Sequence, residues 1–212
     1  DINRMPEIAI PEPVMPAPNA LDYYLEAGSL LTDQPVIQGA VHVLNDDIPK
    51  GWAGLVPTMA RIEAAVTANG PAIARLREGF QHPYQAEPLR SFREFGPQHI
   101  LSQLAETLHV EAELCRRRGD ATGAMRSGLD CLEMAISSQR GCALLAGNQT
   151  SSDEALGRRT LWAVCHQLSA RDTRASARRL ERINAMRVRY AEILEEEKWH
   201  RLASLMDRFS TP

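Results

Sequence analysis

Apolar residues recur with a helical period over most of this chain of 212 residues. The clearest run lies on one stripe within about 60° of arc, at a helical step of about 100° per residue. Its members are Leu101, Leu104, Leu108, Ala112 and Cys115. The rhythm covers residues 52–79 and 98–209, so we expect a mainly helical chain with no sheet larger than a hairpin.

The residues that separate these runs are typical helix caps and stops. Asn19 is placed to cap a first helix after a proline-rich start. Gly119 stops the helix that begins near residue 98, and Asp120 caps the next one. Ser169 or Asp172 caps a basic helix further along.

Three stretches do not follow the helical rhythm. Residues 28–50 have a mixed pattern that is too loose for a strand. Residues 80–97 contain three prolines and form the longest irregular stretch after the N-terminal segment. A run rich in Asn, Thr, Ser and Asp predicts a further loop at roughly 147–153.

Short links between long helices favour antiparallel hairpins. We therefore expect an all-α fold, as an irregular bundle or a short tetratricopeptide-like stack. Residues 19–212 are expected to form a single helical domain, because the composition is globular and the length suffices for one core.

The first 18 residues contain five prolines, at 6, 11, 13, 16 and 18, which favour an extended tether. Such a tether behind a missing start indicates a removed signal peptide or anchor helix. We expect the domain to lie outside the cytoplasm, on the periplasmic side of a membrane. The alternative is a cytoplasmic domain with an arbitrary starting point.

The charge balance limits the classes of partner. With 24 basic and 27 acidic residues, the net charge of −3 argues against a phosphate-binding face over the whole molecule, so we expect no nucleic acid partner. No run of apolar residues is long enough to span a membrane, so membrane association is expected only through the removed anchor.

The segment "AELCRRRGDATGAMRSGLDCLEMA" resembles the turn between the two helices of a tetratricopeptide repeat, and one such unit is visible. A broader resemblance rests on "NALDYYLEA" after the tether, "LREGFQHPYQ", "RGDATGAMRSGLDCLEMA" and "AEILEEEKW". These segments are similar to an uncharacterised family of anchored, exported helical proteins of bacteria. The resemblance implies fold class and location, and the family has no assigned activity that would imply chemistry.

Two E-x-x-H pairs are the sharpest candidates for metal chemistry: Glu106 with His109, and Glu197 with His200. Two such pairs, with one Glu from each of two further helices such as Glu63 and Glu133, build the di-iron site of ferritin-like bundles. On a helical wheel both pairs point away from the apolar stripes and largely toward water. We therefore expect no metal and no cofactor.

Two further motifs have ordinary structural interpretations. The tripeptide Arg118 to Asp120 reads RGD, and a helix C-terminus, a glycine stop and an aspartate cap explain it. Seven arginines between residues 171 and 189 could contact phosphates or anionic lipid, but glutamates follow closely. We expect neighbouring helices to exchange these surface charges. The arginines are Arg171, Arg174, Arg178, Arg179, Arg182, Arg187 and Arg189.

The four cysteines, Cys115, Cys131, Cys142 and Cys165, show no zinc-ligand spacing and resemble small buried hydrophobes. A helical hairpin with its turn near residue 150 would bring Cys131 and Cys165 within about 6 Å along the axis. That offset is near the reach of a disulfide, so their pairing is a hypothesis.

The irregular stretch from Phe80 to Pro97 is the best candidate for a contact surface, because long loops in compact domains cap a core or bind a partner. Both interpretations remain open on the sequence alone. The possible partner-binding residues are Phe80, His82, Tyr84, Arg90, Phe92, Arg93 and Phe95.

The chain shows no nucleophile elbow and no glycine-rich phosphate loop. We expect a non-enzymatic domain that acts through protein–protein contact. The alternatives are a metal-dependent or hydrolytic enzyme with a site assembled between helices, and a small-ligand carrier. Converging carboxylates or histidines in a deep pocket would favour the enzyme, an enclosed apolar cavity the carrier, and an extended apolar groove the binding domain.

The aromatic rings of the 80–97 stretch generate a first prediction. Burying such a ring gains about 1.5 to 3 kcal/mol, which can offset the ordering of a few loop residues. Replacing Phe92 or Phe95 with Ala should lower the free energy of unfolding by about 3 to 5 kcal/mol if the ring is fully buried. Urea denaturation measures this change, and two variants as stable as the parent would show that the rings are exposed.

Overall fold

A computed structural model describes residues 10–45, 56–88 and 97–210, apart from the side chains of 144–147 and 207–210. Every regular element in these ranges is a helix, so the all-α prediction is confirmed. The α-helices in chain order are α1 (Ala20–Ser29), α2 (Gln34–Leu44), α3 (Met59–Ala68), α4 (Gly70–Gly79), α5 (Gln98–Arg117), α6 (Ala121–Ser137), α7 (Leu144–Val164), α8 (Ala170–Ala185) and α9 (Tyr190–Ser210). A single 3-10 turn, η1 (Cys165–Gln167), joins α7 to α8. Residues 10–18 carry no helix, in agreement with the expected extended segment.

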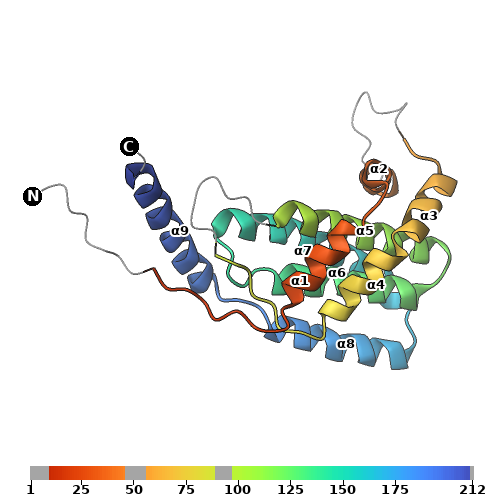
Figure 1. Cartoon of the computed structure of the whole chain (residues 1–212). Coiled ribbons are helices and arrows are strands. Elements are labelled where there is room, and N and C mark those ends of the chain that lie inside the picture. Colours follow the sequence, from red (N-terminus) through yellow and green to blue (C-terminus); the bar gives the residue numbers. More distant parts are fainter. Residues whose placement is uncertain (1–9, 46–55, 89–96, 211–212) are drawn as a thin grey trace, which may run out of the picture.

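Helices α5, α6 and α7 form the centre of the molecule, and the most extensive helix contacts join α6 to each of the other two (Figure 1). The α5–α6 turn is built as its residues predict. Gly119 adopts φ +78°, which a side chain would disfavour, and the Asp120 carboxylate accepts a hydrogen bond from Gly123 N at 2.8 Å. The RGD tripeptide is therefore explained by a helix stop and a cap.

Helices α6 and α7 cross closely because each has a glycine at the contact. A Cβ atom on Gly157 would lie 3.0 Å from the carbonyl oxygen of Gly128 and 3.0 Å from the backbone nitrogen of Leu132. A Cβ atom on Gly128 would lie 3.1 Å from the side chains of Leu161 and Thr160. The two backbones thus approach more closely than larger residues would permit.

Helices α1, α2 and α3 pack on α5, while α4 packs against α1 and α2 lies against α3 (Figure 1). The buried side chain of Asn19 caps α1 by accepting a hydrogen bond from Leu21 N at 3.1 Å, as predicted. Its amide also donates to Gln85 O at 2.8 Å and accepts from Gln85 N at 3.1 Å, so the same side chain holds the chain after α4 against α1.

Three apolar clusters share these helices. One lies between α1, α4, α5 and α6, a second between α2, α3 and α5, and a third between α6, α7 and α8. Because α5 and α6 each contribute to two clusters, both are buried on more than one face. This explains how His109, about 100° from the leucine stripe of α5, comes to be 1% exposed.

Two helical segments were missed or misplaced by the sequence pattern. The mixed stretch at 28–50 contains α2, whose proline lies in its first turn, where a missing N–H costs little. The polar run at 147–153 is not a loop, because α7 continues through it. The link between α6 and α7 instead spans residues 138–143.

The apolar stripe of α9 that contains Leu194 and Leu205 was expected to face the core, and the structure contradicts this expectation. Leu194 and Leu205 are 45% and 46% exposed, whereas Ile193, Ala203 and Ser204 are buried. Helix α9 contacts mainly α7 and leaves the body at one end (Figure 1). These two leucines therefore lie largely in solvent, and the buried side of α9 carries an isoleucine and two small residues.

The structure also corrects the disulfide hypothesis, because all four cysteines are free. Cys131 is buried with its Sγ 3.4 Å from Asp153 O and 3.8 Å from Ala105 O, whereas Cys165 is exposed beyond the end of α7. The error follows from the misplaced turn, since the real link lies before residue 144.

No helix among the described residues is long and apolar enough to cross a membrane.

The close crossing of α6 and α7 generates a second prediction. In an ordinary helix, Gly to Ala stabilises by about 1 kcal/mol through propensity. At Gly157 the added Cβ would meet backbone atoms at 3.0 Å, so Gly157→Ala should instead lower the free energy of unfolding by about 1 to 3 kcal/mol. Gly70→Ala is the matched control, because nothing lies within 4 Å of its Cβ position. Thermal or urea denaturation of both variants is the measurement, and a Gly157→Ala protein as stable as the control would contradict the close crossing.

Candidate functional site

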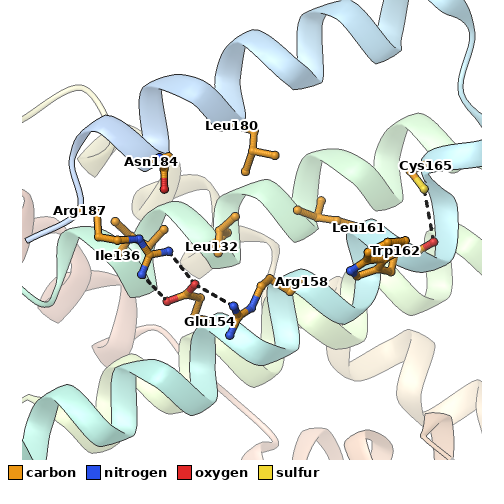
Figure 2. A pocket seen from close by; sticks show the side chains of 10 residues that line it. All are labelled: Leu132, Ile136, Glu154, Arg158, Leu161, Trp162, Cys165, Leu180, Asn184 and Arg187. Carbon is orange, nitrogen blue, oxygen red and sulfur yellow. Dashed lines mark hydrogen bonds and ion pairs between the residues drawn. The ribbon is translucent and has the colours of Figure 1, made fainter.

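An apolar groove of about 410 Å³ lies between α6, α7 and α8 (Figure 2). Helix α6 contributes Leu132 and Ile136 to its floor, and Leu180 of α8 points toward them from the other side. Leu161 of α7 and Asn184 of α8 complete this central part. The groove is therefore walled by three helices whose shared apolar cluster continues beneath it.

One end of the groove is charged. Arg187, just after α8, donates two hydrogen bonds to the buried carboxylate of Glu154, at 2.7 and 3.0 Å. Arg158 reaches the same carboxylate at 3.5 Å, and its side chain is 58% exposed (Figure 2). The hydrogen bonds that Arg187 donates to Glu154 raise the pKa of this guanidinium group. This end carries two guanidinium groups and one carboxylate, so it has an excess of one positive charge.

The other end is an open apolar edge. The side chain of Trp162 is 79% exposed there, and Leu180 is 42% exposed. Cys165 lies beside the ring, where its Sγ donates to Trp162 O at 3.5 Å (Figure 2). A large indole left in water at the mouth of an apolar groove indicates a contact surface rather than a core position.

The chemistry that the groove permits is binding. Its ten lining residues include a single carboxylate, Glu154, which is already engaged by two arginines. No pair of carboxylates or histidines converges among these lining residues, and general acid–base catalysis needs a positioned titratable group. The groove can accept apolar side chains, and its charged end can accept a carboxylate.

A second polar cluster lies between α2, α5 and α7, and it contradicts the helical-wheel interpretation of Glu106 and His109. His109 is buried, with Nδ1 3.2 Å from Thr160 Oγ1 and Nε2 3.2 Å from Asn45 Oδ1. Burial lowers the pKa of His109 to about 4. Burial also raises the pKa of Glu106. Neither residue therefore points to open water, in contrast to the expectation from the helical wheel.

Asp153 belongs to the same region. It is buried, and Ser102 Oγ lies 3.2 and 3.3 Å from its two carboxylate oxygens. Burial raises the pKa of Asp153 to about 6. These groups do not form a metal site, since the described residues contain no group of three or more His, Cys, Asp or Glu side chains that could hold a metal ion.

The other proposed carboxylate ligands lie elsewhere. Glu63 forms an ion pair with Arg118 at 3.0 Å, and Glu133 accepts hydrogen bonds from Arg179 at 2.6 and 3.0 Å. Glu197 pairs with Arg201 on α9 at 2.6 Å. The structure therefore does not bring the four glutamates of a di-iron site together.

The described residues include positions 80–88 of the predicted contact loop. Tyr84 is buried, and its ring stacks on Tyr24 with centroids 5.8 Å apart, while Phe80 meets Tyr24 edge-on at 6.0 Å. These two rings cap the core and cannot be a free contact surface. His82 stacks against Tyr23 at 4.6 Å. The remaining candidates, Arg90, Phe92, Arg93 and Phe95, lie outside the described residues.

The pattern of residues in the sequence does not predict the groove. Its residues come from positions 132 to 187, on three helices and a connecting turn. The one signal in the sequence was Trp162, because a large aromatic residue stands out in a helix that consists mainly of small and polar residues.

A comparison with protein-family models finds no match, and comparisons with curated proteins and with solved structures find none.

The buried His109 and Asp153 generate a third prediction, on pH. The pKa of His109 is about 4, below its ordinary 6.5, so the unfolded state binds more protons and stability falls as pH drops through this range. The pKa of Asp153 is about 6, above its ordinary 3.8, so its contribution has the opposite sign. At about 1.4 kcal/mol per pKa unit, each effect is on the order of 2 to 3 kcal/mol.

Asp153→Asn should therefore lose stability relative to the parent when pH falls from about 7 to 5, and His109→Gln should gain it, each by on the order of 1 to 2 kcal/mol. Urea denaturation at both pH values gives the differences, in which the background from other carboxylates cancels. Parallel pH profiles for all three proteins would contradict the burial of these groups.

Proposed function

We propose that this chain is a non-enzymatic protein-binding domain whose groove between α6, α7 and α8 receives an amphipathic helix of a partner protein. The observation that carries the proposal is the exposed Trp162 at one end of an open apolar groove, with the partly exposed Leu180 on the opposite wall (Figure 2). Tryptophan and arginine are the residues most enriched among those that dominate protein–protein binding energy.

The geometry of the groove defines the kind of helix that fits. Apolar side chains one turn apart, at positions i and i+4, would lie between Leu180 and the floor formed by Leu132 and Ile136. A carboxylate on the next turn would meet Arg158, which is exposed and held by Glu154 only at 3.5 Å. The excess positive charge at this end therefore favours an acidic partner.

Two features support a binding domain over the alternative functions. A carrier would enclose its ligand, whereas Trp162 and Leu180 leave this groove open along one side. An enzyme would place titratable groups together, and Glu154 is the only carboxylate among the lining residues. The α5–α6 hairpin with its Gly119-Asp120 turn also supports a tetratricopeptide-like interaction unit. The proline-rich segment and the family resemblance support a location on the periplasmic side of a membrane.

The fourth prediction tests the groove with a defined probe. The probe is a labelled synthetic helix of about 15 residues, roughly four turns, with leucine at i and i+4 and glutamate on the flanks. Fluorescence anisotropy should detect binding that Leu180→Glu or Trp162→Ala weakens by about tenfold or more, because a loss of about 1.4 kcal/mol corresponds to tenfold.

Matched controls separate the groove from general surface effects. Leu30→Glu changes a leucine that is 46% exposed on another face, and Arg118→Glu changes an arginine whose 58% exposed side chain equals that of Arg158. Both controls should bind the probe like the parent, whereas Arg158→Glu should bind it more weakly. Equal binding by Leu180→Glu and Leu30→Glu would refute the proposed function.

A further inference from the structure

Helix α8 carries a row of four arginines on the side that faces away from the body. Arg171, Arg174, Arg178 and Arg182 are spaced by three, four and four residues, so they lie within about 80° of arc at about 100° per residue. All four are exposed, and α8 lies along the outer edge of the molecule (Figure 1). We call these four residues the arginine row.

The arginine row has one carboxylate near it on its own helix, Glu181, three residues after Arg178. No ion pair joins any of its members to a described carboxylate, although Arg182 donates to the carbonyl oxygen of Arg178 at 3.5 Å. Arg179, about 100° away on the same helix, shows the contrast, because it pairs with Asp130 and Glu133. The expected exchange of charges with α9 is not seen for the row. The glutamates at the start of α9 pair elsewhere, as Glu192 with Arg189 just before the helix and Glu195 with Lys198 within it.

Unpaired like charges at helical spacing are unfavourable. Two like charges at i and i+4 destabilise a helix by about 0.2 to 0.5 kcal/mol, and the row contains three such neighbouring pairs at i+3 or i+4. An opposing row of carboxylates would remove this repulsion and replace it with attraction. The local physics of α8 therefore favours an anionic partner along this face.

We propose that the arginine row binds an acidic helix of a partner protein, one that carries a carboxylate on every turn. The row spans 12 residues, from position 171 to 182, and its 11 steps of about 1.5 Å give a length of about 16 Å. Glutamates at i and i+4 on a facing helix repeat at the same axial distance of about 6 Å. Guanidinium groups bind carboxylates with two parallel hydrogen bonds, which adds orientation to charge attraction.

The net charge of the rest of the molecule disfavours a membrane surface or a long nucleic acid as the partner of the arginine row. The whole chain has a net charge of −3, so the remainder without these four arginines carries −3 − 4 = −7. A membrane surface or a long nucleic acid would bring that negative remainder close to many phosphates. A single helix contacts only the narrow basic face and avoids this repulsion.

The arginine row is independent of the groove. Leu180, which lines the groove, lies about 160° around α8 from both Arg178 and Arg182. The groove and the arginine row can therefore be tested separately. Leu180→Glu changes the groove, and substitutions of Arg174 and Arg178 change the row.

The experiment uses the full chain and a labelled synthetic peptide of about 16 residues, built from alanine with glutamate at every third or fourth position. A scrambled peptide of the same composition distributes its glutamates around the helix. Fluorescence anisotropy at low ionic strength should show that the chain binds the first peptide at least tenfold more tightly than the second. Binding should weaken as salt is added, because exposed charges are screened.

Arg174→Glu with Arg178→Glu should weaken binding at least tenfold, and Arg174→Gln with Arg178→Gln by a smaller factor. Arg117→Glu with Arg118→Glu, two exposed arginines on another surface, and Leu180→Glu should leave binding unchanged. Equal binding of the two peptides, or no loss in the arginine-row variants, would overturn the proposal. Tighter binding to phosphatidylserine vesicles or to a single-stranded oligonucleotide than to the acidic peptide would overturn it as well. Circular dichroism verifies that each variant is folded.

Discussion

The buried charge of Asp130 is the interaction on which the arrangement of the outer helices depends. Its carboxylate lies on α6 and accepts a hydrogen bond from Arg77 of α4 at 2.7 Å and one from Arg179 of α8 at 2.7 Å. Arg77 also donates to Glu111 of α5 at 2.8 Å, and Arg179 lies 5.8 Å from the centre of the Phe80 ring. One carboxylate thus connects helices on two sides of the centre. Breaking such a pair leaves an uncompensated buried charge, which costs about 3 to 5 kcal/mol.

The position of α8, and with it one wall of the groove, follows from this network. Ile183 is the buried residue of α8, and most of the helix is exposed. A helix with so small an apolar contact gains only about 1.5 to 3 kcal/mol from burying that side chain. The ion pairs of Arg179 with Asp130 and Glu133, and of Arg187 with Glu154, therefore carry much of the docking of α8. These ion pairs fix the orientation of α8 as well as its distance from α6.

Much of the helical framework could be predicted from the sequence because it rests on local signals. The caps at Asn19, Asp120 and Ser169 satisfy N–H groups within a few residues of themselves, so their effect needs no tertiary context. The first part of helix α7 was predicted as a loop for a physical reason. Its buried positions recur with a helical period but are filled by small or polar side chains, so hydrophobicity does not reveal them. These positions are Thr150, Asp153, Gly157, Thr160 and Val164.

The site was less predictable than the fold, since it depends on which faces of each helix are covered. A helical wheel assumes one buried face, and α5 is covered on several, so His109 was placed on the wrong side. For α9 the same assumption buried the wrong residues, because Ala203 and Ser204 are buried whereas Leu205 is 46% exposed. The groove requires three helices to meet, and no local pattern specifies how far apart they lie.

The two proposed surfaces on α8 follow from how that helix is held. An amphipathic helix bound to a core by one narrow face leaves opposite sides accessible, and here one side borders the groove while the other carries the arginine row. Charge on an exposed face contributes mainly to the rate and orientation of association, whereas burial of Trp162 and Leu180 would contribute mainly to the lifetime of a complex. A partner that used both surfaces would be oriented by the arginines before its apolar residues reached the groove. Because Asp130 and Glu154 fix α8 in the free molecule, such a partner would meet a wall already in place and would lose little binding energy to ordering it.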